Sequence, residues 1–120
     1  MSSVAGLLTN FSRSEIDQLF KKGRRVLASS AVTILLAPRQ KEYARILLVI
    51  PRRVGNAPER NSIKRRLRAI FYQERLYEKS KDCVFIARKG AARLSYDKLK
   101  KMVLQAYQID MASSATKATF

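Results

Sequence analysis

Histidine and tryptophan are absent from this chain of 120 residues, and Cys83 is its only cysteine. Without histidine, the chain lacks the commonest general acid and base of enzyme sites. The nine acidic residues are dispersed and form no pair spaced like a two-metal site. Cys83 has no base partner and lies in the apolar run at 83–87, so we expect a small buried hydrophobic residue. We therefore expect neither a catalytic residue nor a metal site on this chain.

Long hydrophobic runs are missing as well. The longest uncharged apolar run covers residues 31–38, whereas a helix that spans a bilayer needs roughly 20 such residues. No signal peptide is expected, because the basic cluster follows the first leucines instead of preceding an apolar segment. A single cysteine excludes an intrachain disulfide and fits a reducing compartment. These features predict a soluble cytoplasmic protein without a membrane partner.

Negative charge is scarce. Lysine and arginine number 25 against 9 aspartates and glutamates, which gives a net charge of +16. A compact domain with this charge repels itself unless a polyanion neutralises it, and nucleic acid is the usual polyanion. The length fits one domain, which we place at residues 1–110. Residues 111–120 are dominated by Ala, Ser and Thr, and we expect them to form a disordered tail.

Local sequence patterns predict three helices. The first has the capping box of Ser12 and Glu15 at its start and stops at Gly23. The second runs to about residue 78, with an apolar core stripe, and the third follows a capping Ser95. We expect Gly55, Asn56 and Pro58 to break the chain before the second helix. The expected caps of this helix are Asn61 or Ser62, and its stripe is Ile63, Leu67, Ile70 and Phe71.

Short runs of branched apolar residues at 32–36, 46–50 and 83–87 predict three strands. We expect the first two strands to be antiparallel. The strand, helix and strand within residues 46–87 have the spacing of a parallel crossover unit. The expected fold is an α/β (α+β) sandwich in the order α-β-β-(short β)-α-β-α with a mixed sheet.

Positive charge is concentrated at residues 52–68, which contain seven basic residues and one acidic residue. On a helical wheel at about 100° per residue, most of the helical cations lie opposite the apolar stripe. These cations are Lys64, Arg65, Arg68 and Arg75, with Arg66 at the other margin. The guanidinium group of arginine can donate two parallel hydrogen bonds to one phosphate group. A helix N-terminus beside Arg60 and Asn61 would add backbone amide donors. A solvated cationic face is the plainer interpretation, but too few carboxylates lie nearby to balance it.

RNA is favoured over DNA as the nucleic acid. No short helix precedes the basic helix as in a helix-turn-helix protein, and no heptad repeat follows it as in a basic zipper. Phe20 lies one helical turn before Arg24, and Tyr43 adjoins the second strand, so bases could stack on these rings. Packing of Phe20 in the core is the alternative.

The basic region carries an ordered motif. Residues 53–57, 60–61 and 64–68 resemble the signature K-x-G-N-A-x-x-R-N-x-x-K-R-x-x-R of the bacterial ribonuclease P protein family. The likeness extends over about 95 residues, from near Phe11 to Tyr107. Ser62 stands where the family usually has a third basic residue, and Ile16 replaces a frequent aromatic residue.

This resemblance implies both a fold and a function. The fold would contain an unusual left-handed crossover between parallel strands, against the general right-handed preference. The function would be to assist a catalytic RNA that uses Mg²⁺ to remove the 5′ leader of precursor tRNA. The partners would be the catalytic RNA and precursor tRNA, with no cofactor held by protein groups and no DNA.

The resemblance and the charge pattern together give two sets of candidate residues. The first set is expected to bind the catalytic RNA: Arg52, Arg53, Asn56, Arg60, Asn61, Lys64, Arg65 and Arg68. The second set, Phe20 and Arg24, is expected to line a cleft for the leader between the first helix and the sheet.

Two other functions are compatible with a small basic domain. A structural RNA-binding protein of ribosomal type would share the charge and the fold class. A nuclease that acts without RNA is disfavoured, because histidine is absent and the carboxylates are dispersed.

Overall fold

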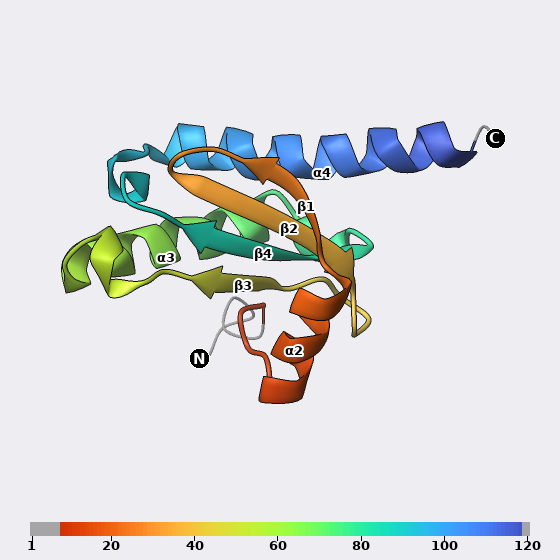
Figure 1. Cartoon of the computed structure of the whole chain (residues 1–120), viewed down its shortest axis with the longest axis horizontal. Helices are drawn as coiled ribbons and strands as arrows, with labels where there is room; N and C mark the ends of the chain where they lie inside the picture. The colour runs from red at the N-terminus through yellow and green to blue at the C-terminus, as the bar shows by residue number, and fades with distance from the viewer. Residues whose placement is uncertain (1–7, 119–120) are drawn as a thin grey trace.

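Four strands form one mixed sheet in the computed structural model, which describes the backbone of residues 8–118 and the side chains of residues 8–112. The strands are β1 (Arg24–Ala28), β2 (Val32–Pro38), β3 (Ile46–Val49) and β4 (Lys81–Ala87). Their order in the sheet is β1-β2-β4-β3 (Figure 1). β2 pairs with β1 and β4 in antiparallel fashion, whereas β3 and β4 are parallel.

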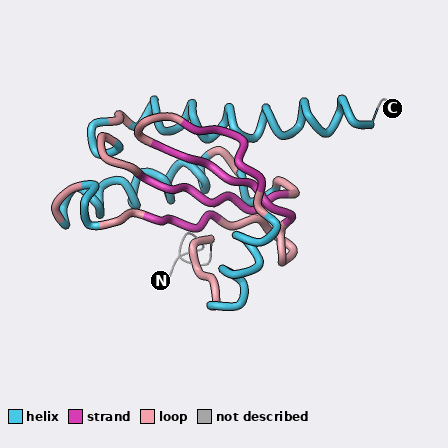
Figure 2. Tube along the Cα trace, in the orientation of Figure 1, coloured by secondary structure: helices cyan, strands magenta, loops and turns pink. Residues whose placement is uncertain are grey.

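Within residues 8–118, three α-helices cover the two faces of the sheet (Figure 2). They are α2 (Arg13–Lys22), α3 (Ala57–Gln73) and α4 (Tyr96–Ala118). The main core lies between the sheet and the pair α3 and α4, and it includes Ile34 and Phe85 of the sheet together with the buried residues of both helices. α2 packs on the opposite face, where its buried Leu19 contacts Ala37 and Val84. The expected α/β (α+β) sandwich with a mixed sheet is therefore confirmed.

α2, the first of the three predicted helices, begins and ends where the sequence predicts. Ser12 Oγ accepts a hydrogen bond from the Glu15 amide at 3.2 Å, and Glu15 Oε1 accepts one from the Ser12 amide at 2.8 Å. At the other end, the Gly23 amide donates to Leu19 O at 2.7 Å. A Cβ atom on Gly23 would lie 2.6 Å from that carbonyl oxygen, so glycine is required where the chain leaves α2 for β1.

α3, the second of the predicted helices, begins earlier than predicted. Its N-cap is Asn56, whose Oδ1 accepts a hydrogen bond from the Glu59 amide at 2.9 Å. The prediction of Asn61 or Ser62 as the cap was therefore wrong. Pro58 misled the prediction, because proline in the first turn starts a helix instead of breaking it. The helix also ends at Gln73, before the predicted residue 78, so Arg75 lies outside it with a φ of 54°. The predicted apolar stripe is confirmed, with all four members buried.

The sheet corrects two further expectations. The strands at 32–36 and 46–50 do run in opposite directions, but β4 lies between them and they do not pair. The extra short strand is β1, before β2, whereas the segment before α3 is a 3₁₀ turn at Arg52–Val54. β1 is an edge strand whose first two residues, Arg24 and Arg25, are exposed, so it carries no apolar alternation that the sequence could reveal.

α3 connects two parallel neighbours, β3 and β4. In Figure 1 both arrows point the same way, β4 lies above β3, and α3 passes behind the sheet. This arrangement is a left-handed crossover, in agreement with the family resemblance.

α4 begins as predicted, because Ser95 Oγ accepts a hydrogen bond from the Lys98 amide at 3.2 Å. The helix continues to Ala118, through most of the segment where we expected a disordered tail. Residues 119–120 lie outside the described part. Cys83 is fully buried in β4, and this burial raises the pKa of its thiol well above the usual range. It is therefore the small core residue that the sequence predicts.

Candidate nucleic-acid interface

The outer side of α3 carries the basic residues that the sequence singles out. Asn61, Arg65 and Arg68 are exposed, while Arg60 and Lys64 are half-buried at the margins of the helix. Arg60, Lys64 and Arg68 are four residues apart, so they form one row with a rise of about 6 Å between neighbours. The opposite side of α3 is buried in the core. The core therefore orients this row of cations toward solvent.

The positive charge of the row has little local compensation. Among the side chains of residues 8–112, the ion pairs involve Lys41, Arg45, Arg75 and Lys100, and none of the α3 cations. Glu59 is the only acid in α3, and its Oε1 accepts the Asn56 amide at 2.9 Å. Arg60 donates from Nε to Gly55 O at 3.1 Å, which orients its guanidinium beside the start of the helix. The row is thus a cationic surface suited to phosphate groups, and Arg60 is its member with a defined orientation.

The start of α3 differs from the expected anion site. Arg60 and Asn61 lie inside the helix, and the capping box of Asn56 and Glu59 already occupies two backbone amides. Asn56 therefore acts as a cap through its side chain. The Glu59 carboxylate adds a negative charge at this end, so phosphate contacts are expected from the side chains of the row instead of the free amides.

Arg52 and Arg53 are exposed in the 3₁₀ turn that precedes α3. Arg53 also lines a hollow together with Lys89 and Arg93. The sequence analysis missed these last two cations, because they follow β4 and only the crossover brings them beside α3. No local pattern marks them, so the fold was needed to find them.

The row of cations borders an apolar part of the sheet. Lys64 and Arg68 line a small hollow with Leu47 and Leu48 of β3. Leu47 belongs to a group of half-buried residues on the face that α2 only partly covers. We call this group the open face, and it consists of Leu35, Leu47, Val49 and Ile86. Cationic and apolar surfaces therefore meet along β3.

Phe20 is 47% exposed, so the alternative of core packing is wrong. On the α2 wheel, Gln18 and Lys22 fall on one flank of Leu19, and both line a hollow near Arg39. Phe20 falls on the other flank, so we expect its ring to lie beside the open face.

Arg24 does not lie where the sequence analysis put it. In the β1 and β2 pair, Arg24 is opposite Leu36, whose side chain is buried on the α4 side of the sheet. Directly opposed residues share a face, so Arg25, opposite Leu35, is the arginine on the side of the open face. Arg24 was predicted between the first helix and the sheet, and the structure places it on the other side of the sheet.

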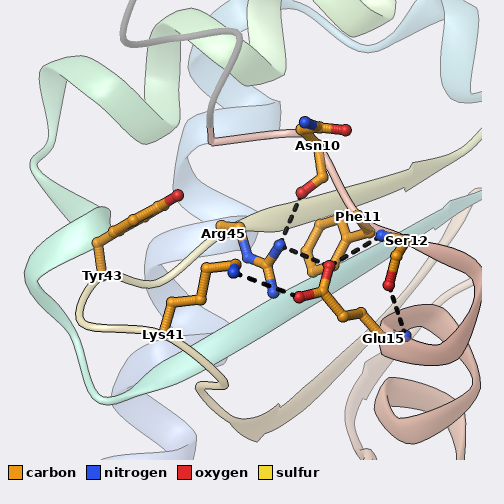
Figure 3. A pocket seen from close by; sticks show the side chains of 7 residues that line it. All are labelled: Asn10, Phe11, Ser12, Glu15, Lys41, Tyr43 and Arg45. Atoms are coloured by element: carbon orange, nitrogen blue, oxygen red, sulfur yellow. Dashed lines mark hydrogen bonds and ion pairs between the residues drawn. The ribbon is translucent and has the colours of Figure 1, made fainter.

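A buried arginine links α2 to the sheet (Figure 3). Arg45 is 1% exposed and pairs with Glu15 through Nη1 at 3.1 Å. The Ser12 amide and then Arg45 hold the pKa of Glu15 at about 2, below its usual 4.5. Asp82 is also buried, and desolvation raises its pKa despite hydrogen bonds from two backbone amides.

Nowhere among the residues that the structure describes do three His, Cys, Asp or Glu side chains gather as metal ligands would. Every helix described there is too short or too polar to cross a membrane.

Comparisons with known proteins agree with this geometry. The Ribonuclease P family matches residues 11–109. The "Ribonuclease P protein component" of Streptococcus mutans is 35% identical over 98 residues, which cover 82% of each chain. The RNase P protein from Thermotoga maritima has a similar structure, with a TM-score of 0.67 and 26% identity over 81% of this chain and 92% of that one. The Staphylococcus aureus RNase P protein shares the fold, with a TM-score of 0.72 at 21% identity over 86% and 94% of the two chains.

Proposed function

Because this chain belongs to the ribonuclease P protein family, we propose that it binds the catalytic RNA of ribonuclease P and assists removal of the 5′ leader from precursor tRNA. The observation that carries this proposal is the uncompensated row of cations on α3. Such a row neutralises phosphates of a folded RNA and lets its strands approach closely. The Mg²⁺ ions of the reaction are held by the RNA, and the protein supplies electrostatic support.

The leader of precursor tRNA is bound on the open face. Phe20 offers a ring on which a base can stack, the aliphatic floor of Leu35 and Ile86 accepts further bases, and Arg25 can contact a phosphate. Lys64 and Arg68 border both surfaces, so one strand of RNA can pass from the leader site to the catalytic RNA.

Reconstitution at low magnesium tests the function. The purified chain, mixed with a bacterial ribonuclease P RNA, should restore cleavage of precursor tRNA at a magnesium concentration where the RNA alone is inactive. A folded sample that fails to do so with a cognate RNA would favour the structural, ribosomal type of RNA-binding protein. Cleavage by the protein freed of RNA would favour a nuclease that acts alone.

Arg65→Ala tests the footprint on α3. The variant should bind the catalytic RNA more weakly and reduce the slope of log K against log salt by about 0.7 to 0.9, the effect of one phosphate contact. Lys101→Ala is the matched control, because it removes one exposed positive charge from α4. If both variants keep the slope of the wild type, Arg65 makes no phosphate contact.

A further inference from the structure

Arg45 is a buried cation that reaches from the start of β3 to the start of α2. Its Nη1 donates to Asn10 O at 2.7 Å and to Glu15 Oε1 at 3.1 Å, and its Nη2 donates to Gln40 Oε1 at 2.7 Å. The guanidinium carbon lies 4.0 Å from the centre of the Phe11 ring. Figure 3 shows Asn10, Phe11 and Glu15 around the Arg45 guanidinium. A single side chain therefore holds the approach to α2 and its first turn.

The contacts continue into the sheet. Gln40 Nε2 donates to Glu15 O at 2.9 Å, which adds a second link to α2. Asp82 in β4 accepts from the Arg45 amide at 2.8 Å and from the Gln40 amide at 3.3 Å. We define the Arg45 cluster as Asn10, Phe11, Glu15, Gln40, Arg45 and Asp82. It joins α2 to the inner strand β4 through hydrogen bonds and the Arg45–Glu15 ion pair, with the Phe11 ring packed against the guanidinium.

Apolar packing holds α2 weakly by comparison. Leu19 is its only buried residue, and it lies in the second half of the helix. The C-terminal end is also fixed by the direct passage through Gly23 into β1. The N-terminal end has no buried apolar residue within the helix, so its placement depends on the Arg45 cluster.

The cluster is a poor source of net stability. Arg45 Nε is buried without a hydrogen-bond partner, and burying a guanidinium group is costly even when it is paired. Its bonds are directional, however, and the planar fork of arginine fixes geometry better than a single ammonium group does. The contribution of such a cluster lies more in orientation than in free energy of folding.

We propose that Arg45 is a positioning residue for leader binding: by fixing the first turn of α2, it fixes the rotation of the helix and thus the place of Phe20 beside the open face. Arg45 does not touch RNA in this arrangement. The inference rests on the proposed function, because the open face matters here as the leader site.

Binding measurements on the assembled protein and RNA test the inference. Arg45→Met keeps an unbranched side chain beside the Phe11 ring and removes the guanidinium group. The matched control is Arg66→Met, because Arg66 donates to Leu94 O at 2.9 Å and braces α3 far from α2. For each variant, two affinities are measured: that of the protein for the catalytic RNA, and that of the holoenzyme for precursor tRNA relative to tRNA without a leader.

We expect Arg45→Met to lower the leader-dependent gain in affinity by roughly fivefold to tenfold, the scale of one misplaced stacked base. Its affinity for the catalytic RNA should stay that of the wild type. Arg45→Lys should recover part of the gain, because an ammonium can pair with Glu15 but cannot also reach Asn10 O and Gln40. Arg66→Met should keep the full gain.

The outcomes separate this inference from the proposed function. If the wild type gains nothing from a leader, the proposed function fails. If the wild type gains and Arg45→Met keeps that gain, the positioning inference is overturned. A variant that loses affinity for the leader and for the catalytic RNA alike would also overturn it, because the effect would then be general destabilisation.

A spectroscopic readout needs no RNA. The chain has no tryptophan, so Phe20→Trp creates one reporter at the position of interest. Its emission maximum should shift when Arg45→Met is added and stay unchanged when Arg66→Met is added. Where Arg45→Met does not fold, Glu15→Gln replaces it, since glutamine can still accept the Ser12 amide while the charge pairing with Arg45 is lost. An unchanged emission in the folded variants would contradict the inference.

Discussion

At the scale of the residue, Glu15 closes the capping box of α2 and pairs with Arg45, and its pKa of about 2 lies below the ordinary 4.5. An acid with a lowered pKa stabilises the folded state above its ordinary pKa, and this stabilisation is lost as pH falls toward the folded value. The pKa of Asp82 is raised, so its contribution has the opposite sign. Loss of stability between about pH 4.5 and pH 2 therefore comes from Glu15 and is partly offset by Asp82.

Glu15→Gln should flatten this acid dependence. The melting temperature of the variant should lie below that of the wild type at neutral pH and approach it as pH falls toward about 2. Thermal melts followed by circular dichroism at a series of pH values provide the measurement. A difference between the two proteins that stays constant over the whole range would show that the carboxylate is not the group that titrates.

Phe20 gives a second prediction at this scale. Phe20→Ala should weaken the binding of precursor tRNA by roughly 1–3 kcal/mol, the value of one base stacked on a ring. Since Phe20 is 47% exposed, the fold should be unaffected. The affinity for tRNA without a leader is the internal control. An equal loss with and without the leader would remove Phe20 from the leader site.

Single residues also show where sequence reasoning ends. Helical periodicity predicted which α3 side chains face solvent, because the buried stripe determines the rest of the wheel. The choice between Arg24 and Arg25 depends on the register of β1 against β2, and a shift of one residue exchanges the two faces of a strand. No pattern within an exposed edge strand fixes that register, so the prediction failed there.

At the scale of the element, the N-cap of α3 raises the question whether Asn56 stabilises the helix or binds RNA. Asn56 was predicted to bind RNA, yet its side chain holds the Glu59 amide. Asn56→Ala should lower the free energy of unfolding by about 1 kcal/mol, as the loss of an N-cap does. Urea denaturation measures this change.

The control is Asn56→Ser, which can still cap the helix. It should keep the stability and the affinity for the catalytic RNA. Loss of RNA affinity in Asn56→Ser at unchanged stability would mean that the amide itself contacts RNA.

The elements that the sequence predicted best are those with strong local signals. The capping box at Ser12 and the cap at Ser95 located the starts of α2 and α4. α3 was placed late because Pro58 was taken for a breaker, although its missing amide has no partner to lose in the first turn of a helix. β1 was not predicted, because its exposed arginines interrupt the alternation of apolar and polar residues that indicates a strand.

At the scale of the whole molecule, the net charge of +16 opposes compact folding. The melting temperature should therefore rise when ionic strength increases from about 20 to about 200 mM, because salt screens the repulsion. The cognate RNA should raise it further at low salt. Differential scanning fluorimetry measures both effects. A melting temperature that falls with salt would mean that ion pairs such as that of Arg45 and Glu15 outweigh the repulsion.

The arrangement of the sheet shows why topology was harder to predict than composition. The charge and the motif around Arg60 pointed to RNA and to the family without any structure. The order β1-β2-β4-β3, by contrast, depends on contacts between strands far apart in the chain, as where Ile46 pairs with Cys83. Such contacts leave no local signal, and the combination of Lys89 and Arg93 with Arg53 was invisible for the same reason.

The central position of β4 has a consequence for biosynthesis. Both β2 and β3 pair with β4, yet β4 is the last strand to be made. A nascent chain that ends before Lys81 can form the β1 and β2 hairpin but has no strand on which to dock β3, so α3 lacks the completed sheet against which it packs. A ribosome must therefore synthesise most of the chain before the cationic helix is oriented. Chains truncated before Lys81 should lack the ordered cationic surface altogether.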